Sequence, residues 1–180
     1  MTTTTDPLAP GRTSYRLLFI LAAVVFALDQ ATKLWIVHLS GFPHGFYPPF
    51  GGMEIIPGFF SLVYTTNAGA AWGILEGRGS ILLGIAVIAL GTIYFFRREL
   101  ELSRTPMQLA FGLIIGGILG NSLDRLVHGH VIDFLDVHLG FYRWPTFNIA
   151  DSGIVVGCAF YIYLSFRSPG PPPEPTGQQV

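Results

Sequence analysis

The chain alternates long apolar runs with shorter polar connections, the pattern of a protein that crosses a membrane several times. Four stretches are rich in apolar residues over helical lengths, at residues 15–37, 80–96, 107–126 and 149–166. Each approaches the roughly 20 residues that a helix needs to cross about 30 Å of hydrocarbon. We therefore predict an all-α integral membrane protein with four transmembrane helices, whose folded domain covers residues 15–166.

The longest connection, residues 40–79, predicts a small β-structure outside the membrane. Prolines and glycines punctuate it on both sides of the run 59–66, which is rich in aromatic and β-branched residues. Turn residues around such a run are typical of short strands. We expect an extracytoplasmic β-cradle within residues 40–79, resting on the membrane surface. The two ends, residues 1–14 and 167–180, are rich in Thr, Pro, Gly and Gln and are predicted to be disordered cytoplasmic tails.

The positive charges predict the orientation. Cationic residues next to membrane spans mark the cytoplasmic side, so both termini are expected there. The composition fits this class, with 51% hydrophobic residues, 12% charged residues and a mean hydropathy of +0.53. A net charge of −1 without a basic stripe excludes nucleic-acid binding. Six of the ten Lys and Arg residues fall on the predicted cytoplasmic side: Arg12, Arg16, Arg97, Arg98, Arg104 and Arg167.

Ionisable residues collect at one end of the predicted spans. Antiparallel threading brings them to one depth, near the extracytoplasmic surface, and charges in that setting indicate either a functional site or paired structural groups. Asp29 and Lys33 have the i, i+4 spacing of an ion pair, and Asp29 is open to both interpretations. Asp124 and Arg125 are each expected to reach a neighbouring helix. The converging residues are Asp29, Lys33, Asp124, Arg125, Asp133 and Asp151.

Asp133 and Asp151 differ from the other acids because each lies among apolar residues with no cation beside it in the sequence. Two carboxylates brought close in a low-dielectric site do not both ionise easily, so one keeps a proton. Such a pair can activate water and protonate a carbonyl. Asn67, Asn121 and Asn148 both donate and accept hydrogen bonds, which suits orienting the carboxylates or gripping a peptide backbone.

At these residues the sequence resembles the lipoprotein signal peptidases, also called signal peptidase II. The resemblance implies a multi-pass bacterial inner-membrane protein that cuts diacylglyceryl-modified prolipoproteins just before the lipidated cysteine, at the extracytoplasmic face. The matching blocks run in the family's order: Asp29-Gln30-Ala31-Thr32-Lys33, Asn67-Ala68-Gly69-Ala70-Ala71-Trp72-Gly73, Gly120-Asn121-Ser122-Leu123-Asp124-Arg125, Gly129-His130-Val131-Ile132-Asp133-Phe134 and Phe147-Asn148-Ile149-Ala150-Asp151-Ser152.

The resemblance also implies roles for individual residues. Asp133 and Asp151 are expected to be the catalytic dyad of an aspartic endopeptidase that needs no metal and no cofactor. Membrane lipids and lipid-modified prolipoproteins are the expected partners, and a monomer is sufficient. The residues expected to bind substrate or to organise the site are Asn67, Gly69, Asn121, Asp124, Arg125, Asn148, Asp29 and Lys33.

Two other functions remain open at this stage. A membrane metallopeptidase could use His128 and His130, which lie close in sequence to Asp133, Asp136 and His138. A short His-x-His spacing is not specific for zinc, and no His-Glu-x-x-His helix is present in the sequence. A small proton-coupled transporter would also carry acids within its spans, although here the acids gather at one end.

Overall fold

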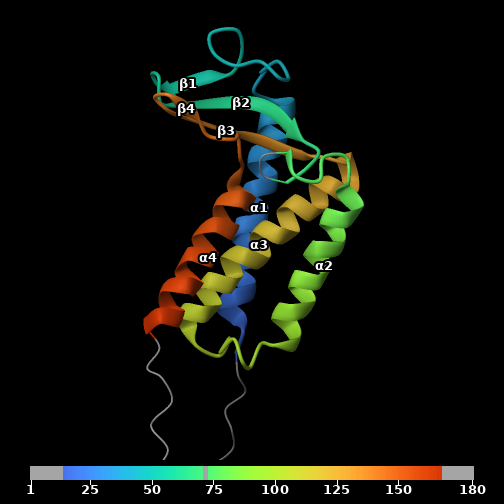
Figure 1. Ribbon diagram of the computed structural model, residues 1–180, viewed down its shortest axis with the longest axis vertical. Helices are drawn as coiled ribbons and strands as arrows, with labels where there is room; N and C mark the ends of the chain where they lie inside the picture. Colours follow the sequence, from blue (N-terminus) through green and yellow to red (C-terminus); the bar gives the residue numbers. More distant parts are fainter. Residues whose placement is uncertain (1–13, 71–72, 168–180) are drawn as a thin grey trace, which may run out of the picture.

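The computed structural model describes residues 14–70 and 73–167, so the predicted tails lie outside the described residues apart from positions 14 and 167. Figure 1 shows α1, α3 and α4 side by side with α2 on the outer side of α3, and a sheet beyond one end of the helices. The elements in chain order are α1 (Arg16–His38), β1 (Met53–Ile56), β2 (Phe60–Asn67), α2 (Gly79–Phe95), α3 (Thr105–His128), β3 (Val131–Leu139), β4 (Tyr142–Arg143) and α4 (Ile149–Arg167).

All four apolar runs form helices close to the predicted limits. Of the described helices, α1, α3 and α4 are long and apolar enough to cross a membrane, whereas α2 is apolar but shorter, with 17 residues. Helix α2 buries none of its residues in the protein. Its exposed apolar side chains, such as Ile85, Val87 and Ile88, suit contact with lipid rather than with water.

Glycines of α3 allow the close approach of α1 and α4. A Cβ atom added to Gly116 would lie 2.7 Å from the Ala22 carbonyl oxygen and from Val25 Cβ. A Cβ atom on Gly120 would lie 2.5 Å from a carboxylate oxygen of Asp29. These distances are shorter than real side chains adopt, so glycine is required where the polar residues of α1 meet α3.

The sheet differs from the prediction because half of its strands come from another part of the chain. Its order is β1-β2-β3-β4, with antiparallel neighbours. Strands β1 and β2 lie within residues 40–79 as expected, but β3 and β4 follow α3, outside the predicted β-region. Thr65 pairs with Asp133 and Asn67 with Val131. This pairing joins segments far apart in sequence, which local patterns do not reveal.

The core consists of two apolar clusters separated along α1 by a polar layer. One cluster surrounds Leu18, Phe111 and Ile114, and the other joins Ile36 to β3. Between them, α1 carries the buried residues Asp29 and Lys33. The polar layer therefore lies where the helices meet the sheet.

Candidate active site

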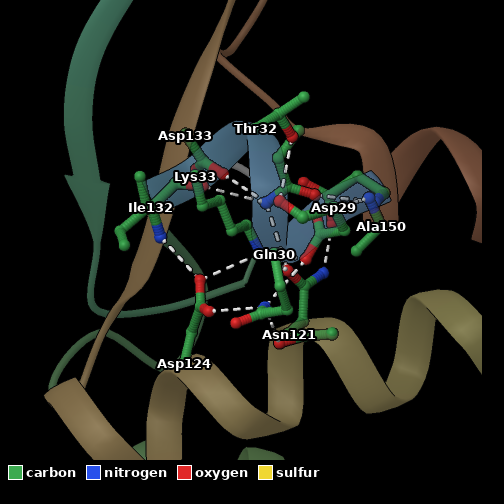
Figure 2. Close-up of polar contacts among 12 residues, drawn as sticks. Asp29, Gln30, Thr32, Lys33, Asn121, Asp124, Ile132, Asp133 and Ala150 are labelled. Atoms are coloured by element: carbon green, nitrogen blue, oxygen red, sulfur yellow. Dashed lines mark hydrogen bonds and ion pairs between the residues drawn. The ribbon is translucent and has the colours of Figure 1, made fainter. Parts of the chain in front are cut away.

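A buried lysine between two carboxylates forms the inner part of the polar layer (Figure 2). The ammonium of Lys33 lies 2.7 Å from a carboxylate oxygen of Asp29 and 2.9 Å from one of Asp124. All three residues are at most 1% exposed. The predicted i, i+4 pair on α1 is therefore present, and Asp124 joins α3 to α1 as expected.

Both carboxylates of this inner group also bind backbone that leads directly to the candidate catalytic residues. Asp29 accepts a hydrogen bond of 2.9 Å from the amide of Ala150, at the start of α4. Asp124 accepts one of 3.0 Å from the amide of Ile132, at the start of β3. In each case the next residue along the chain is a candidate catalytic aspartate. The carboxylates of Asp29 and Asp124 thus fix the backbone next to both candidate catalytic residues.

Gln30 completes this inner group, and its role was not predicted. Its amide nitrogen donates to Asp29 at 3.1 Å, to Asp124 at 3.0 Å and to the Gly120 carbonyl at 3.3 Å. A neutral amide beside a charged residue carries no distinctive sequence pattern. Its position directly after Asp29 in the first matching block was the available signal.

Two asparagines connect the inner group to the candidate dyad. Lys33 donates to the amide oxygen of Asn121 at 3.1 Å, and a lysine ammonium only donates hydrogen bonds. The amide nitrogen of Asn121 must therefore face the other way, where it donates to Asp151 at 2.7 Å. Asn148 donates to Asp133 at 2.7 Å and accepts from the Asp151 backbone amide at 2.9 Å. Each candidate aspartate thus receives a hydrogen bond from an asparagine side chain.

Asp133 is buried on β3 and forms no salt bridge with the described part of the chain. Burial, and then the nearby charge of Asp151, raise the pKa of its carboxyl to about 7, against the opposing effects of Asn148, Asn67 and Lys33. The group therefore retains its proton more readily than an ordinary aspartate does. Asp151 stands in the first turn of α4, where the helix dipole favours negative charge.

Arg125 departs from the expectation that it bridges to a neighbouring helix. One guanidinium nitrogen donates to the Gly69 carbonyl at 2.9 Å, in the connection after β2, and another donates to the Asn121 carbonyl at 3.2 Å. Gly69 is held in turn by its amide, which donates to the Asn67 side chain at 2.9 Å. Arg125 therefore ties the segment after β2 to α3.

A cavity of about 470 Å³ opens beside these residues. Its polar lining includes Asn67, Arg125, Asp151 and Ser152, so Asp151 of the candidate dyad borders it. The rest of the wall is largely apolar and is formed by Ala70, Val131, Trp144, Pro145, Thr146, Phe147, Ile154, Val155 and Val156.

The histidines do not assemble a metal centre in the described residues. The ring centroids of His128 and His130 are 6.0 Å apart, and the described residues contain no group of three or more His, Cys, Asp or Glu side chains that could hold a metal ion. His138 instead contacts Asp136, at 3.0 Å. The described residues therefore offer no set of metal ligands for the metallopeptidase alternative.

Comparison with known proteins agrees with the geometry. A model of the family described as signal peptidase (SPase) II matches residues 21–167. The chain belongs to the signal peptidase II family. A lipoprotein signal peptidase of Oleidesulfovibrio alaskensis is 41% identical over 159 residues, covering 86% of this chain and 96% of the relative. One of Aeromonas hydrophila is 43% identical over 152 residues, covering 82% and 87%.

The fold is also similar to that of solved bacterial membrane enzymes. One, determined by the in meso method at 2.3 Å resolution, is 33% identical, with a TM-score of 0.74 over 83% of this chain and 87% of the other. Membership of the signal peptidase II family and the apolar helices make this chain a bacterial membrane protease of lipoprotein processing. The matched region contains every candidate site residue.

Proposed function

We propose that the protein is an aspartic endopeptidase that removes the signal peptide from diacylglyceryl-modified prolipoproteins, cutting just before the lipidated cysteine. The observation that carries this proposal is the placement of Asp133 and Asp151. They come from different elements, share the Asn121–Asn148 amide pair, and Asp151 borders a largely apolar cavity. The backbone amide that precedes each of them is bound by a carboxylate of the inner group, Asp124 for Asp133 and Asp29 for Asp151.

The two carboxylates divide the work of hydrolysis. In the proposed reaction one carboxylate takes a proton from water, and the hydroxide formed attacks the scissile carbonyl carbon while the protonated partner donates to the carbonyl oxygen. A tetrahedral intermediate results. When the carbon–nitrogen bond breaks, the cysteine nitrogen takes a proton from the dyad and leaves as an amine. Asp133 suits the protonated role because the pKa of its carboxyl is raised to about 7.

The neighbouring polar residues provide the supporting roles in this proposal. Asn67, Gly69 and Arg125 meet at the cavity edge and hold the substrate backbone. The organising residues, which keep the two carboxylates in position, are Asp29, Lys33, Asn121, Asp124 and Asn148.

The lipid of the substrate suits the apolar side of the cavity. Val155 and Val156 on α4 line the cavity and are more than half exposed on the helix surface. In the proposed complex, acyl chains lie against the helices and anchor the cysteine at the depth of the dyad, which orients the scissile bond. The proposal places four spans in the inner membrane, both termini in the cytoplasm, the sheet and active site at the extracytoplasmic face, and a monomer as the working unit.

The test is cleavage of a lipidated prolipoprotein by the purified protein in detergent, with and without a metal chelator. We expect wild type to release the signal peptide in the chelator, and Asp133→Asn and Asp151→Asn to be inactive while still folded. A matched control is Glu101→Gln, in an exposed ion pair of the α2–α3 connection, which should cleave normally. Loss of cleavage in the chelator, or activity of both dyad variants, would refute the proposal.

A further inference from the structure

A second buried aspartate of β3, Asp136, lies outside the proposed catalytic group. Its side chain is completely buried and accepts two hydrogen bonds from the Arg143 guanidinium, one to each carboxylate oxygen and each 2.7 Å long. His138 contacts the same carboxylate at 3.0 Å. Asp136 and Asp133 are three positions apart on one strand, so their side chains leave opposite faces. The two aspartates therefore have separate surroundings.

Arg143 joins this carboxylate to a third part of the chain. Its guanidinium lies over the ring of Tyr47, 3.4 Å from the ring centroid. Tyr47 belongs to the connection between α1 and β1. The hydrogen bonds from Arg143 to Asp136 raise the pKa of the guanidinium, so Arg143 stays positively charged in this contact. We call Asp136, Arg143 and Tyr47 the hairpin clamp, because Asp136 lies on β3 and Arg143 on β4, the two strands of one hairpin.

The clamp is located where the chain leaves the sheet and becomes the wall of the cavity. Trp144 directly follows Arg143, and residues 144–147 line the cavity beside the candidate dyad. Strand β4 has two residues, and a hairpin this short is weakly stable by itself. Besides the clamp, the wall segment is held by backbone bonds from Trp144 to Val137 and between Phe147 and Leu135.

We propose that the hairpin clamp is a positioning element that sets the 144–147 wall and so determines how tightly the lipopeptide substrate is bound. Neither Asp136 nor Arg143 is placed at the reacting atoms. The clamp acts through the wall, whereas the inner ions act on the backbone next to the dyad. This inference rests on the proposed function and adds a determinant of substrate affinity to it.

The first test separates binding from chemistry in the prolipoprotein assay. Arg143→Gln and Asp136→Asn should each raise KM about tenfold and change kcat less than about twofold, because a misplaced wall weakens binding in the ground state and transition state alike. Arg143→Lys keeps the charge but not the two-pronged geometry, so it should recover part of the loss. An unchanged KM, or a fall in kcat at unchanged KM, would overturn the proposal.

The second test does not depend on activity. Hydrogen exchange of a peptide covering residues 140–148 should be faster in Arg143→Gln than in wild type, because the amides of Trp144 and Phe147 are bonded to β3. The matched control is Arg104→Gln, which breaks an exposed ion pair with Glu101 and should leave this peptide unchanged. Equal exchange in Arg143→Gln and wild type would refute the clamp even if wild type cleaved no prolipoprotein. Faster exchange with an inactive wild type would refute the proposed function alone.

Discussion

The polar layer contains two pairs of aspartates in opposite electrostatic situations. Asp29 and Asp124 share the ammonium of Lys33, at 2.7 Å and 2.9 Å. Asp133 and Asp151 instead receive neutral amide donors from Asn148 and Asn121. The first pair shares one buried ammonium. The second pair forms no salt bridge with the described part of the chain, and in the proposed reaction one of its members carries a proton.

The contrast predicts that one residue type serves two functions in the proposed site. Removing a partner from a buried ion pair leaves an uncompensated charge, which destabilises the fold. Removing a carboxylate that has no direct cation relieves an unfavourable burial. The inner pair, Asp29 and Asp124, should therefore be needed for stability. The outer pair, Asp133 and Asp151, should be needed for hydrolysis. Variants of the two pairs should have different consequences.

The largest expected effect is on hydrolysis in the outer pair. Asp133→Asn and Asp151→Asn should each lower kcat at least about 10³-fold, because neither amide can act as a general acid or base. Their melting temperatures in detergent should equal or exceed that of wild type. The comparison fails if either variant retains near-normal cleavage, or if both melt far below wild type.

The next largest effect is on stability in the inner group. Lys33→Met leaves Asp29 and Asp124 buried without a cation, and should lower the free energy of unfolding by roughly 3–5 kcal/mol. Thermal unfolding in detergent measures this change. Arg104→Gln, which breaks an exposed pair, should change stability by less than about 1 kcal/mol. A Lys33→Met protein as stable as wild type would show that the inner ions are dispensable.

A smaller effect concerns the pH dependence of stability. The pKa of Asp133 is raised from 3.8 to about 7 in the folded protein. Between these values the folded state holds a proton that the unfolded state has released, so stability falls as pH rises through this window. The amide of the Asp133→Asn variant has no such proton, so this variant should be more stable than wild type by roughly 1–3 kcal/mol at pH 8. The two proteins should converge near pH 4. A constant difference between pH 4 and pH 8 would contradict the raised pKa.

The sequence was sufficient to predict the helices and the end of the bundle where the polar residues gather, but not the second half of the sheet. Apolar runs long enough to span a membrane are governed by local composition, and the polar residues at their ends identified Asp29, Lys33 and Asp124. Strand β3 lies outside the predicted β-region, although its β-branched residues between Gly129 and Gly140 were a usable signal. Its partner β2 is separated from it by α2 and α3.

The contacts within the site were even less accessible to sequence reasoning. Gln30 and the hairpin clamp depend on which atoms meet across elements, and a neutral amide or an isolated arginine carries no distinctive spacing. Arg125 was assigned to a helix contact but binds the Gly69 carbonyl. The residues that gather at one end of the helices can thus be predicted from a single sequence, whereas donor and acceptor partners require the fold.

The smallest expected effect tests how far the two outer carboxylates influence each other. Burial is the larger cause of the raised pKa of Asp133 and the charge of Asp151 the second. In Asp151→Asn the pKa of Asp133 should therefore fall below about 7 but remain above the ordinary 3.8. Isotope-edited infrared spectroscopy of aspartate carboxyl groups, with Asp133→Asn/Asp151→Asn as the blank, measures this titration. An unchanged pKa would mean that Asp133 does not sense its proposed partner, which removes the electrostatic basis of the dyad. A fall to 3.8 would mean that repulsion rather than burial holds the proton, and the contrast with the inner pair would then lie in the neighbouring charge alone.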